Sequence, residues 1–222
     1  MTDLAERKEA TAPGPGQEAV KRALDIALAS VLIVSMAPLL LLLCCLVRST
    51  SAGPAFFRQE RLGRDMRPFT MLKLRSMYAG SDDRMHRAYV TGMLSAEQEA
   101  PARSGALFKL ADDPRITPLG AWLRRTSLDE LPQLVNVLRG DMSLVGPRPM
   151  LPWEAQLLAA PYRPRFIVKP GITGLWQVSG RSRLPMRRAL ELDVEYARRR
   201  SVVLDLTILA RTVPALFRGG AS

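Results

Sequence analysis

The chain has 222 residues, enough for one domain with an apolar core or for one domain with an appendage. Its formal net charge is +11, and residues 48–222 hold 28 basic against 16 acidic side chains, which favours anionic partners: phosphorylated substrates, anionic lipid or nucleic acid. Two adjacent cysteines argue against a zinc site, and a single histidine in a polar stretch argues against a Ser-His-Asp hydrolase.

The N-terminal part divides into a polar tail and an apolar segment. Residues 1–20 are rich in Ala, Glu, Pro and Gly and predict a disordered tail. Residues 26–47 carry no charge and are long enough to cross a bilayer, but Pro38 interrupts them and both flanks are basic. Two positive flanks favour a re-entrant element that enters and leaves by one face. A single spanning helix with a proline kink is the alternative.

The next 70 residues predict short strands and a surface helix. Residues 53–63 are typical of a turn, a short strand and a basic loop, and residues 69–77 alternate as a strand with Lys73 and Arg75 on one face. These two cations could contact phosphates, although spacing alone favours a solvated face. Residues 81–105 predict a surface helix and loop, and residues 118–120 a turn.

An acidic pair, Asp129 and Glu130, then stands in a basic neighbourhood. Taken alone, the segment 127–130 matches a capping box in which Ser127 caps a helix and Glu130 returns the hydrogen bond. Pro132 weakens this reading, because it would remove a hydrogen bond from the first turns and distort them. The distorted turn could then present its carboxylates outward.

A carboxylate can also act on a phosphate, and then it needs cations to offset the charge repulsion. Arg124, Arg125 and Arg148 are the candidates, and flanking prolines would hold Arg148 stiffly. Adjacent residues of a helix do not share a face, so the two carboxylates should have different roles. Further along, residues 134–138 are apolar, 139–141 form a turn, 150–162 and 185–200 suit helices, and an amphipathic helix begins at 202.

In this order the motifs resemble the bacterial sugar transferases, the monotopic phosphoglycosyl transferases. The matching segments cover residues 21 to about 212: 21–25, Pro38, 53–59, 73–77, 113–117, 124–133, 140–149 and 170–181. The resemblance implies that a UDP-sugar donates its phosphosugar to undecaprenyl phosphate, that UMP leaves, and that an exopolysaccharide, capsule or O-antigen is started. It also implies a re-entrant helix.

The resemblance assigns roles residue by residue. Asp129 would be the nucleophile that forms a covalent phosphosugar intermediate, with Mg²⁺ at Asp129 and Glu130. Glu130 would help to place metal or acceptor, and Arg148 would clamp the phosphate. Further phosphate or substrate ligands would come from the other basic or amide side chains of the matching segments: Lys73, Arg75, Arg115, Arg124, Gln177 and Arg181.

The expected fold is α+β and mostly helical, with residues 1–20 as tail, 21–47 as the re-entrant membrane helix broken at Pro38, and 48–222 as a small cytoplasmic catalytic domain with amphipathic interfacial helices and short strands. Both ends of the membrane element would lie on the cytoplasmic side of the bacterial inner membrane. Expected partners are a UDP-sugar, undecaprenyl phosphate and membrane lipid, without nucleic acid; the sugar and a homo-oligomeric state stay open.

One departure and one alternative accompany this expectation. Some relatives carry Ser directly before the membrane proline, whereas here Ala37 precedes Pro38 and the nearest hydroxyl is Ser35. The geometry of the break is therefore open. The alternative is a basic, membrane-tethered binding module for nucleic acid or anionic lipid, although the arginines form no patch interleaved with aromatic residues.

Overall fold

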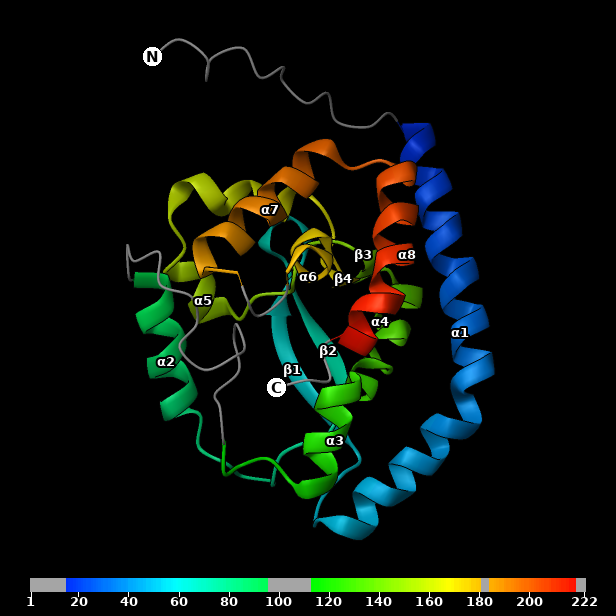
Figure 1. Ribbon diagram of the computed structural model, residues 1–222, viewed down its shortest axis with the longest axis vertical. Helices are drawn as coiled ribbons and strands as arrows, with labels where there is room; N and C mark the ends of the chain where they lie inside the picture. The colour runs from blue at the N-terminus through cyan, green and yellow to red at the C-terminus, as the bar shows by residue number, and fades with distance from the viewer. Residues whose placement is uncertain (1–14, 96–112, 181–183, 219–222) are drawn as a thin grey trace.

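The computed structural model describes residues 15–95, 113–180 and 184–218 (Figure 1). The described part is mostly helical with short strands, as the sequence predicts. The α-helices are α1 (Pro15–Thr50), α2 (Arg84–Ser95), α3 (Pro118–Thr126), α4 (Gln133–Arg139), α5 (Pro152–Gln156), α6 (Leu175–Ser179), α7 (Met186–Arg199) and α8 (Val202–Arg218). The strands are β1 (Phe56–Leu62), β2 (Pro68–Leu74), β3 (Ser143–Val145) and β4 (Gly171–Thr173).

Helix α1 is the apolar segment, and it is longer than expected. It begins at Pro15, inside the stretch predicted as tail, and continues through Pro38 without ending. The helix changes direction in its second half (Figure 1), as expected where a proline removes one backbone donor. Ser35 donates its hydroxyl to the carbonyl of Leu32 at 3.2 Å, so it does not bond the Val34 carbonyl that Pro38 leaves without a donor. Among the described residues, α1 alone is long and apolar enough to cross a membrane.

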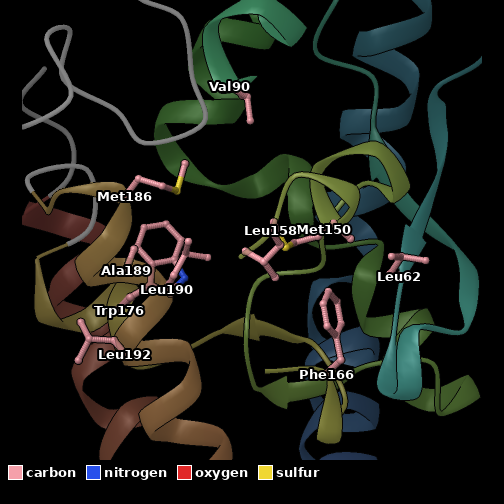
Figure 2. Packing of buried hydrophobic residues seen from close by; sticks show 11 residues of the cluster. Leu62, Val90, Met150, Leu158, Phe166, Trp176, Met186, Ala189, Leu190 and Leu192 are labelled. Carbon is pink, nitrogen blue, oxygen red and sulfur yellow. The ribbon is translucent and has the colours of Figure 1, made fainter. Parts of the chain in front are cut away.

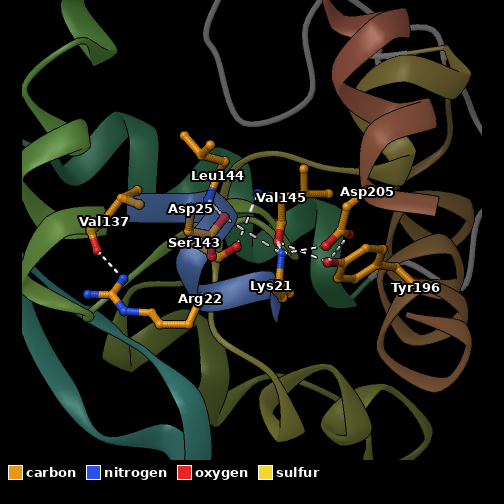
Figure 3. A network of polar contacts seen from close by, with 9 residues as sticks. All are labelled: Lys21, Arg22, Asp25, Val137, Ser143, Leu144, Val145, Tyr196 and Asp205. Atoms are coloured by element: carbon orange, nitrogen blue, oxygen red, sulfur yellow. Dashed lines mark hydrogen bonds and ion pairs between the residues drawn. The ribbon is translucent and has the colours of Figure 1, made fainter. Parts of the chain in front are cut away.

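Both ends of α1 pack on the rest of the protein. Near its start it contacts α4, β3 and α8, where Asp25 accepts a hydrogen bond from the backbone N–H of Leu144 (Figure 3). Near its end, Leu43 and Val47 are buried in one cluster with Leu123 of α3. Its outer face is apolar and exposed, with Val31, Val34, Leu41 and Leu42 between 56 and 75 % accessible.

Strands β1 and β2 form an antiparallel hairpin in the middle of the fold (Figure 1). The register pairs Phe57 with Lys73, and the hairpin places Lys73 beside the turn that carries the acidic pair. The alternating pattern over residues 69–77 predicted β2. The strand ends at Leu74, however, so Arg75 lies beyond it.

Strands β3 and β4 form a short parallel pair that the sequence did not predict. Ser143 lies opposite Gly171 and Val145 opposite Thr173. The two chains approach so closely that a Cβ on Gly171 would overlap the backbone of Gly146, which explains a glycine at this crossing. The pair fixes the start of the turn at 146–149, because that turn follows β3 directly.

One of the two larger buried apolar clusters lies between α7, the segment 150–167 and β1 (Figure 2). Met150, Leu158 and Phe166 of that segment pack against a group that includes Leu190 of α7 and Leu62 of β1. The helix expected over 150–162 is interrupted: α5 ends at Gln156, and a 3₁₀ segment follows over Ala160–Ile167. Pro161 and Pro164 supply no N–H to a longer α-helix, which accounts for the break.

Candidate active site

The acidic pair follows a left-handed residue rather than a helix cap. Thr117 caps α3 by accepting a hydrogen bond from the N–H of Gly120 at 2.9 Å, so α3 begins where the sequence predicted a turn. The helix ends at Ser127, whose φ of 59° is left-handed and whose side chain caps nothing. The capping box predicted for Ser127 and Glu130 is therefore wrong.

Instead, Leu128–Glu130 form a 3₁₀ turn that leads into α4. The N–H of Glu130 bonds the carbonyl of Ser127 at 3.2 Å, and Pro132, which has no N–H, precedes the first residue of α4. The distortion expected from Pro132 is therefore present as a tight turn. In this turn Asp129 is buried, at 7 % accessibility, whereas the side chain of Glu130 is 34 % accessible.

Each carboxylate has a different cation beside it. The ammonium of Lys73 donates to Oε1 of Glu130 at 2.9 Å. Burial lowers the pKa of Arg124, and the charge of Asp129 is the largest influence in the opposite direction, so this guanidinium lies close to the Asp129 carboxylate. Asp129 thus shares a desolvated environment with an arginine, and Glu130 is held by a lysine from the hairpin.

The turn after β3 carries Arg148, and two arginine side chains donate hydrogen bonds to its carbonyls. The carbonyl of Arg148 accepts a hydrogen bond from Nη2 of Arg165 at 2.8 Å, and the carbonyl of Pro149 accepts one from Nη1 of Arg61 at 3.1 Å. The Arg148 guanidinium lies 3.9 Å from Oε2 of Glu154. Two buried arginines therefore hold the carbonyl of the residue expected to clamp a phosphate and the carbonyl of the residue that follows it.

Arg61 connects this turn with the acidic pair. Burial lowers its pKa to about 9, and the charge of Arg148 acts in the same direction. The carboxylates of Glu154 and Glu130 act in the opposite direction, so Arg61 lies within electrostatic reach of both halves of the site. A dianionic phosphate bound between the halves would meet several guanidinium groups that are already partly desolvated.

Four residues of this support were not predicted as site residues: Arg61, Glu154, Arg165 and Asp193. Arg165 and Asp193 form a buried ion pair at 2.5 Å, and Glu154 accepts the N–H of Leu151 at 2.8 Å. A helix-start pattern, with Pro at the first position and Glu at the third, was available at 152–154. Sequence carried no signal for Arg165 and Asp193, which meet across 28 residues.

The remaining predicted ligands divide into three groups. Arg115 forms a two-pronged ion pair with Asp113, at 2.6 and 2.8 Å, and both influence Arg124. Gln177 lies on α6 next to Gly174, which contacts the backbone of Gly146, so it borders the start of the turn at 146–149. Arg75 instead donates to the carbonyls of Val47, Ser51 and Ala52 at the end of α1.

Arg181 lies outside the described residues. The structure therefore gathers Asp129, Glu130, Lys73 and Arg124 at one turn, with Arg148 linked to them through Arg61. The Arg75 guanidinium instead donates hydrogen bonds to backbone carbonyls at the end of the apolar helix.

The acidic pair suits Mg²⁺ by its chemistry. Magnesium in phosphoryl-transfer sites is held by one or two carboxylates and completes its coordination with water and substrate phosphate oxygens. Asp129 and Glu130 supply two such carboxylates, one of them partly exposed. Over the described residues there is no group of three or more His, Cys, Asp or Glu side chains arranged for a metal, so substrate would complete the site.

A comparison with protein families bears directly on this site. The model for the bacterial sugar transferases matches residues 16–219, which include the acidic turn, Arg148 and all of α1 except its first residue. The chain belongs to the bacterial sugar transferase family. The match extends from the first turn of the apolar helix to the end of α8, so the apolar helix and the candidate site residues belong to one family unit.

Individual relatives of this bacterial sugar transferase agree with the assignment. The exopolysaccharide production protein ExoY of Sinorhizobium fredii is 36 % identical over 196 residues, which cover 88 % of this chain and 84 % of that protein. A UDP-glucose:undecaprenyl-phosphate glucose-1-phosphate transferase of Caulobacter vibrioides is 41 % identical, over 88 % of this chain and 69 % of that protein. The undecaprenyl-phosphate galactose phosphotransferase of Salmonella typhimurium is 38 % identical, over 90 % and 40 %.

Proposed function

We propose that this sugar transferase moves a sugar 1-phosphate from a UDP-sugar to undecaprenyl phosphate and releases UMP. The observation that carries the proposal is a buried Asp129 within electrostatic reach of Arg124, in a turn where Lys73 holds Glu130. The names of the relatives from Caulobacter and Salmonella supply the carrier lipid and the class of reaction. The name of ExoY supports a role in starting exopolysaccharide synthesis, with capsule or O-antigen as further outlets of this chemistry.

In the first step, a carboxylate oxygen of Asp129 attacks the β-phosphorus of the UDP-sugar. The new O–P bond forms as the bond between that phosphorus and the bridging oxygen breaks, and the electron pair leaves with UMP. Charge repulsion between carboxylate and diphosphate opposes this attack. Arg124, within electrostatic reach of Asp129, and Arg148, whose carbonyl is held by Arg165, would offset the phosphate charge.

In the second step, an oxygen of undecaprenyl phosphate attacks the phosphorus of the aspartyl-phosphosugar. The Asp129–phosphorus bond breaks, the carboxylate is restored, and a polyprenyl-diphosphate-linked sugar is released. Glu130, held at 2.9 Å by Lys73, is placed to orient the acceptor or to share a metal with Asp129. Mg²⁺ bound at the two carboxylates would neutralise phosphate charge during both steps.

We also propose that α1 re-enters the cytoplasmic face of the inner membrane rather than crossing it. Both of its ends are packed on the same folded body: Lys21 and Asp25 bond groups on α8 and β3, and Val47 lies in a cluster with Leu123. If that body is on one side of the membrane, both ends are there too. The exposed apolar residues of the bent middle would lie in lipid.

The test is a release assay with purified protein in detergent, undecaprenyl phosphate and Mg²⁺. UDP-glucose, UDP-galactose and UDP-N-acetylated sugars are supplied one at a time, and UMP is measured. We expect UMP release with at least one donor, and loss of at least 10⁴-fold in Asp129→Asn, because an amide is a poor nucleophile.

The matched control is Glu191→Gln, which removes a carboxylate from the exposed face of α7 and should keep full activity. Absence of UMP release with every donor, or an active Asp129→Asn enzyme, would remove the support for this function.

A further inference from the structure

A second charged region lies away from the acidic pair. A cavity of about 320 Å³ opens where α1 and α8 begin, and Arg22 is part of its lining. Arg22 also donates to the carbonyls of Val137 and Leu138, at the C-terminal end of α4, whereas Glu130 precedes the N-terminal end of the same helix. The seven residues of α4 therefore separate the cavity from the acidic pair by about 10 Å.

The lining of the cavity is strongly basic. It includes five cations (Lys21, Arg22, Arg64, Lys169 and Arg200) and two carboxylates (Glu18 and Asp25), which leaves a net charge of +3. A concentration of positive charge of this kind raises the free energy of the folded protein, because the partly buried cations repel one another. An anion in the cavity would offset this repulsion.

The two carboxylates are already engaged. Glu18 accepts a hydrogen bond from Arg200 and lies 3.6 Å from Arg64, and these contacts lower the pKa of Glu18. Asp25 accepts the N–H of Leu144 and lies 3.8 Å from Lys21. Asp205 of the adjoining crevice pairs with Lys21 at 2.6 Å, so the five cations face three carboxylates and the region keeps a net charge of +2.

Lys169 is the cation that remains available. It has no hydrogen bond or ion pair within the described part of the chain, and it lies near the Arg22 guanidinium. Burial and the charge of Arg22 lower its pKa. The charges of Asp25 and Asp141 act in the opposite direction, but within the described residues neither forms an ion pair with Lys169, so an anionic ligand would add a direct contact that this ammonium lacks.

The basic cavity continues into an apolar crevice between α1 and α8. The crevice shares Lys21, Asp25, Val145 and Val202 with the cavity and is otherwise lined by Asp205, which pairs with Lys21, and by five leucines: Leu24, Leu28, Leu144, Leu206 and Leu209. Leu206 is 50 % and Leu28 is 38 % accessible, so the crevice opens on the side where α1 exposes its apolar face. The crevice encloses only about 10 Å³, so a hydrocarbon chain would lie along the leucines at its mouth rather than inside it, next to the charged cavity.

We propose that the cavity and the crevice together bind an anionic phospholipid at a site separate from the sugar-transfer site. The phosphodiester would lie among Lys169, Arg22 and Arg64, and one acyl chain would follow the leucines between α1 and α8. Basic side chains at a membrane surface attract such headgroups, and arginine forks match phosphate oxygens. The proposal depends on the membrane contact of α1 but not on the chemistry of Asp129.

The bound lipid would strengthen an existing link between α1, β3 and α8. Lys21 donates to Oδ2 of Asp205 at 2.6 Å, and the hydroxyl of Tyr196 lies 2.7 Å from Oδ1 of Asp205 and 2.9 Å from the carbonyl of Val145 (Figure 3). Val145 is the last residue before the turn that carries Arg148. A phosphate bound by Arg22 of α1 and by Lys169, whose backbone lies against Gly146, would therefore hold both the start of the membrane helix and the base of the active-site turn.

The test measures lipid affinity of the full-length protein by native mass spectrometry and by Tm, with phosphatidylglycerol or phosphatidylcholine added to the detergent. We expect phosphatidylglycerol to be retained and to raise Tm, and phosphatidylcholine to do neither. Lys169→Met should weaken phosphatidylglycerol at least about fivefold, the equivalent of one lysine near an anionic surface. Arg188→Met, which removes an exposed cation of α7, is the matched control and should not change the affinity.

Further measurements distinguish a lipid phosphate from free phosphate, and a second variant tests the proposal independently of any folding defect in Lys169→Met. Leu206→Gln leaves every cation in place and should also weaken the binding of phosphatidylglycerol, because the acyl chain loses an apolar contact. Inorganic phosphate should not raise Tm. Three results would each overturn the proposal. The first is a full rise in Tm with inorganic phosphate. The others are a Lys169-dependent retention of undecaprenyl phosphate without phosphatidylglycerol, and equal retention of phosphatidylglycerol by Lys169→Met and the wild type. Lipid retention is read independently of turnover, so it can hold or fail whatever the sugar assay gives.

Discussion

Asp129 and Glu130 are neighbours in sequence but meet different surroundings. In a 3₁₀ turn successive side chains point about 120° apart, so one carboxylate is buried towards Arg124 while the other reaches Lys73. The sequence predicted that the two would have different roles. It did not predict which cation each would meet, because Lys73 lies 57 residues before Glu130.

Lys73 should matter for turnover more than for stability. Lys73→Met removes the 2.9 Å ion pair to Glu130, and we expect UMP release to fall at least tenfold while Tm changes little, since a partly exposed pair contributes little to folding. The same assay on Arg187→Met, which breaks a surface ion pair with Glu191, is the control. Unchanged turnover in Lys73→Met would separate this lysine from the site.

The buried pair below the Arg148 turn should give a pH dependence. Burial raises the pKa of Asp193 from 3.8 to about 6, with Arg165 acting against the shift. The folded protein then binds a proton more tightly than the unfolded chain, so this contribution to stability is largest below pH 4 and is lost as pH rises through 6. The two pKa values set its ceiling at about 3 kcal/mol.

We therefore expect the Tm of the wild type to fall relative to the Tm of Asp193→Asn as pH rises from 4 to 7. Thermal melts of both proteins in one detergent and one buffer series measure it. A difference that moves in favour of the wild type over that range would mean that the ion pair outweighs the burial of the carboxylate.

At the scale of elements, periodic segments were predictable and long-range pairings were not. The alternation over residues 69–77 predicted β2, and the helix expected over 185–200 is α7; both agree within a few residues. The parallel pair β3–β4 joins segments 28 residues apart, and three residues carry too little pattern to reveal it. Neither proline marks the structure that was expected from it. The helix α1 continues through Pro38, where a break was expected, and α3 begins at Pro118, where a turn was expected.

Arg75 illustrates how a tertiary contact decides a role. From spacing it was a candidate phosphate ligand on the face of Lys73, but β2 ends before it and its guanidinium turns to the end of α1. Three backbone carbonyls there have no partner within the helix and accept its N–H groups.

Arg75→Met should accordingly act on stability. We expect a loss of about 2–4 kcal/mol, because a buried cation that satisfies several carbonyls is removed. The KM for the UDP-sugar should stay within about twofold of wild type, because the side chain does not face the acidic turn. Melting curves and initial rates on one preparation check both. A normal Tm combined with a strongly raised KM would restore the phosphate-ligand role.

At the scale of the whole molecule, the apolar helix and the catalytic body are one unit. A straight helix of 36 residues would be about 54 Å long, well above the 30 Å hydrocarbon core of a bilayer. Here the helix is bent and its two ends contact the same body through polar bonds at one end and Leu43 and Val47 at the other. The basic flanks in the sequence predicted this arrangement; the packing of both ends supports it.

Topology can be measured in sealed cells. After Cys44 and Cys45 are replaced, single cysteines at Val20 and Thr50, both exposed, report the two ends of α1. We expect neither to react with an impermeant maleimide until the inner membrane is permeabilised, when both should react. Reaction of either one from the periplasm in intact cells would show that α1 crosses the membrane.

The central claim is that Asp129 becomes covalently bonded to the phosphosugar. The most direct measurement is mass spectrometry of protein incubated with a UDP-sugar and Mg²⁺ without undecaprenyl phosphate, quenched in acid and digested. We predict that the peptide containing Asp129 gains the mass of one sugar phosphate with loss of one water, that undecaprenyl phosphate removes it, and that Asp129→Asn never acquires it. An adduct on another residue, or steady UMP release without any adduct and with retained activity in Asp129→Asn, would contradict the account.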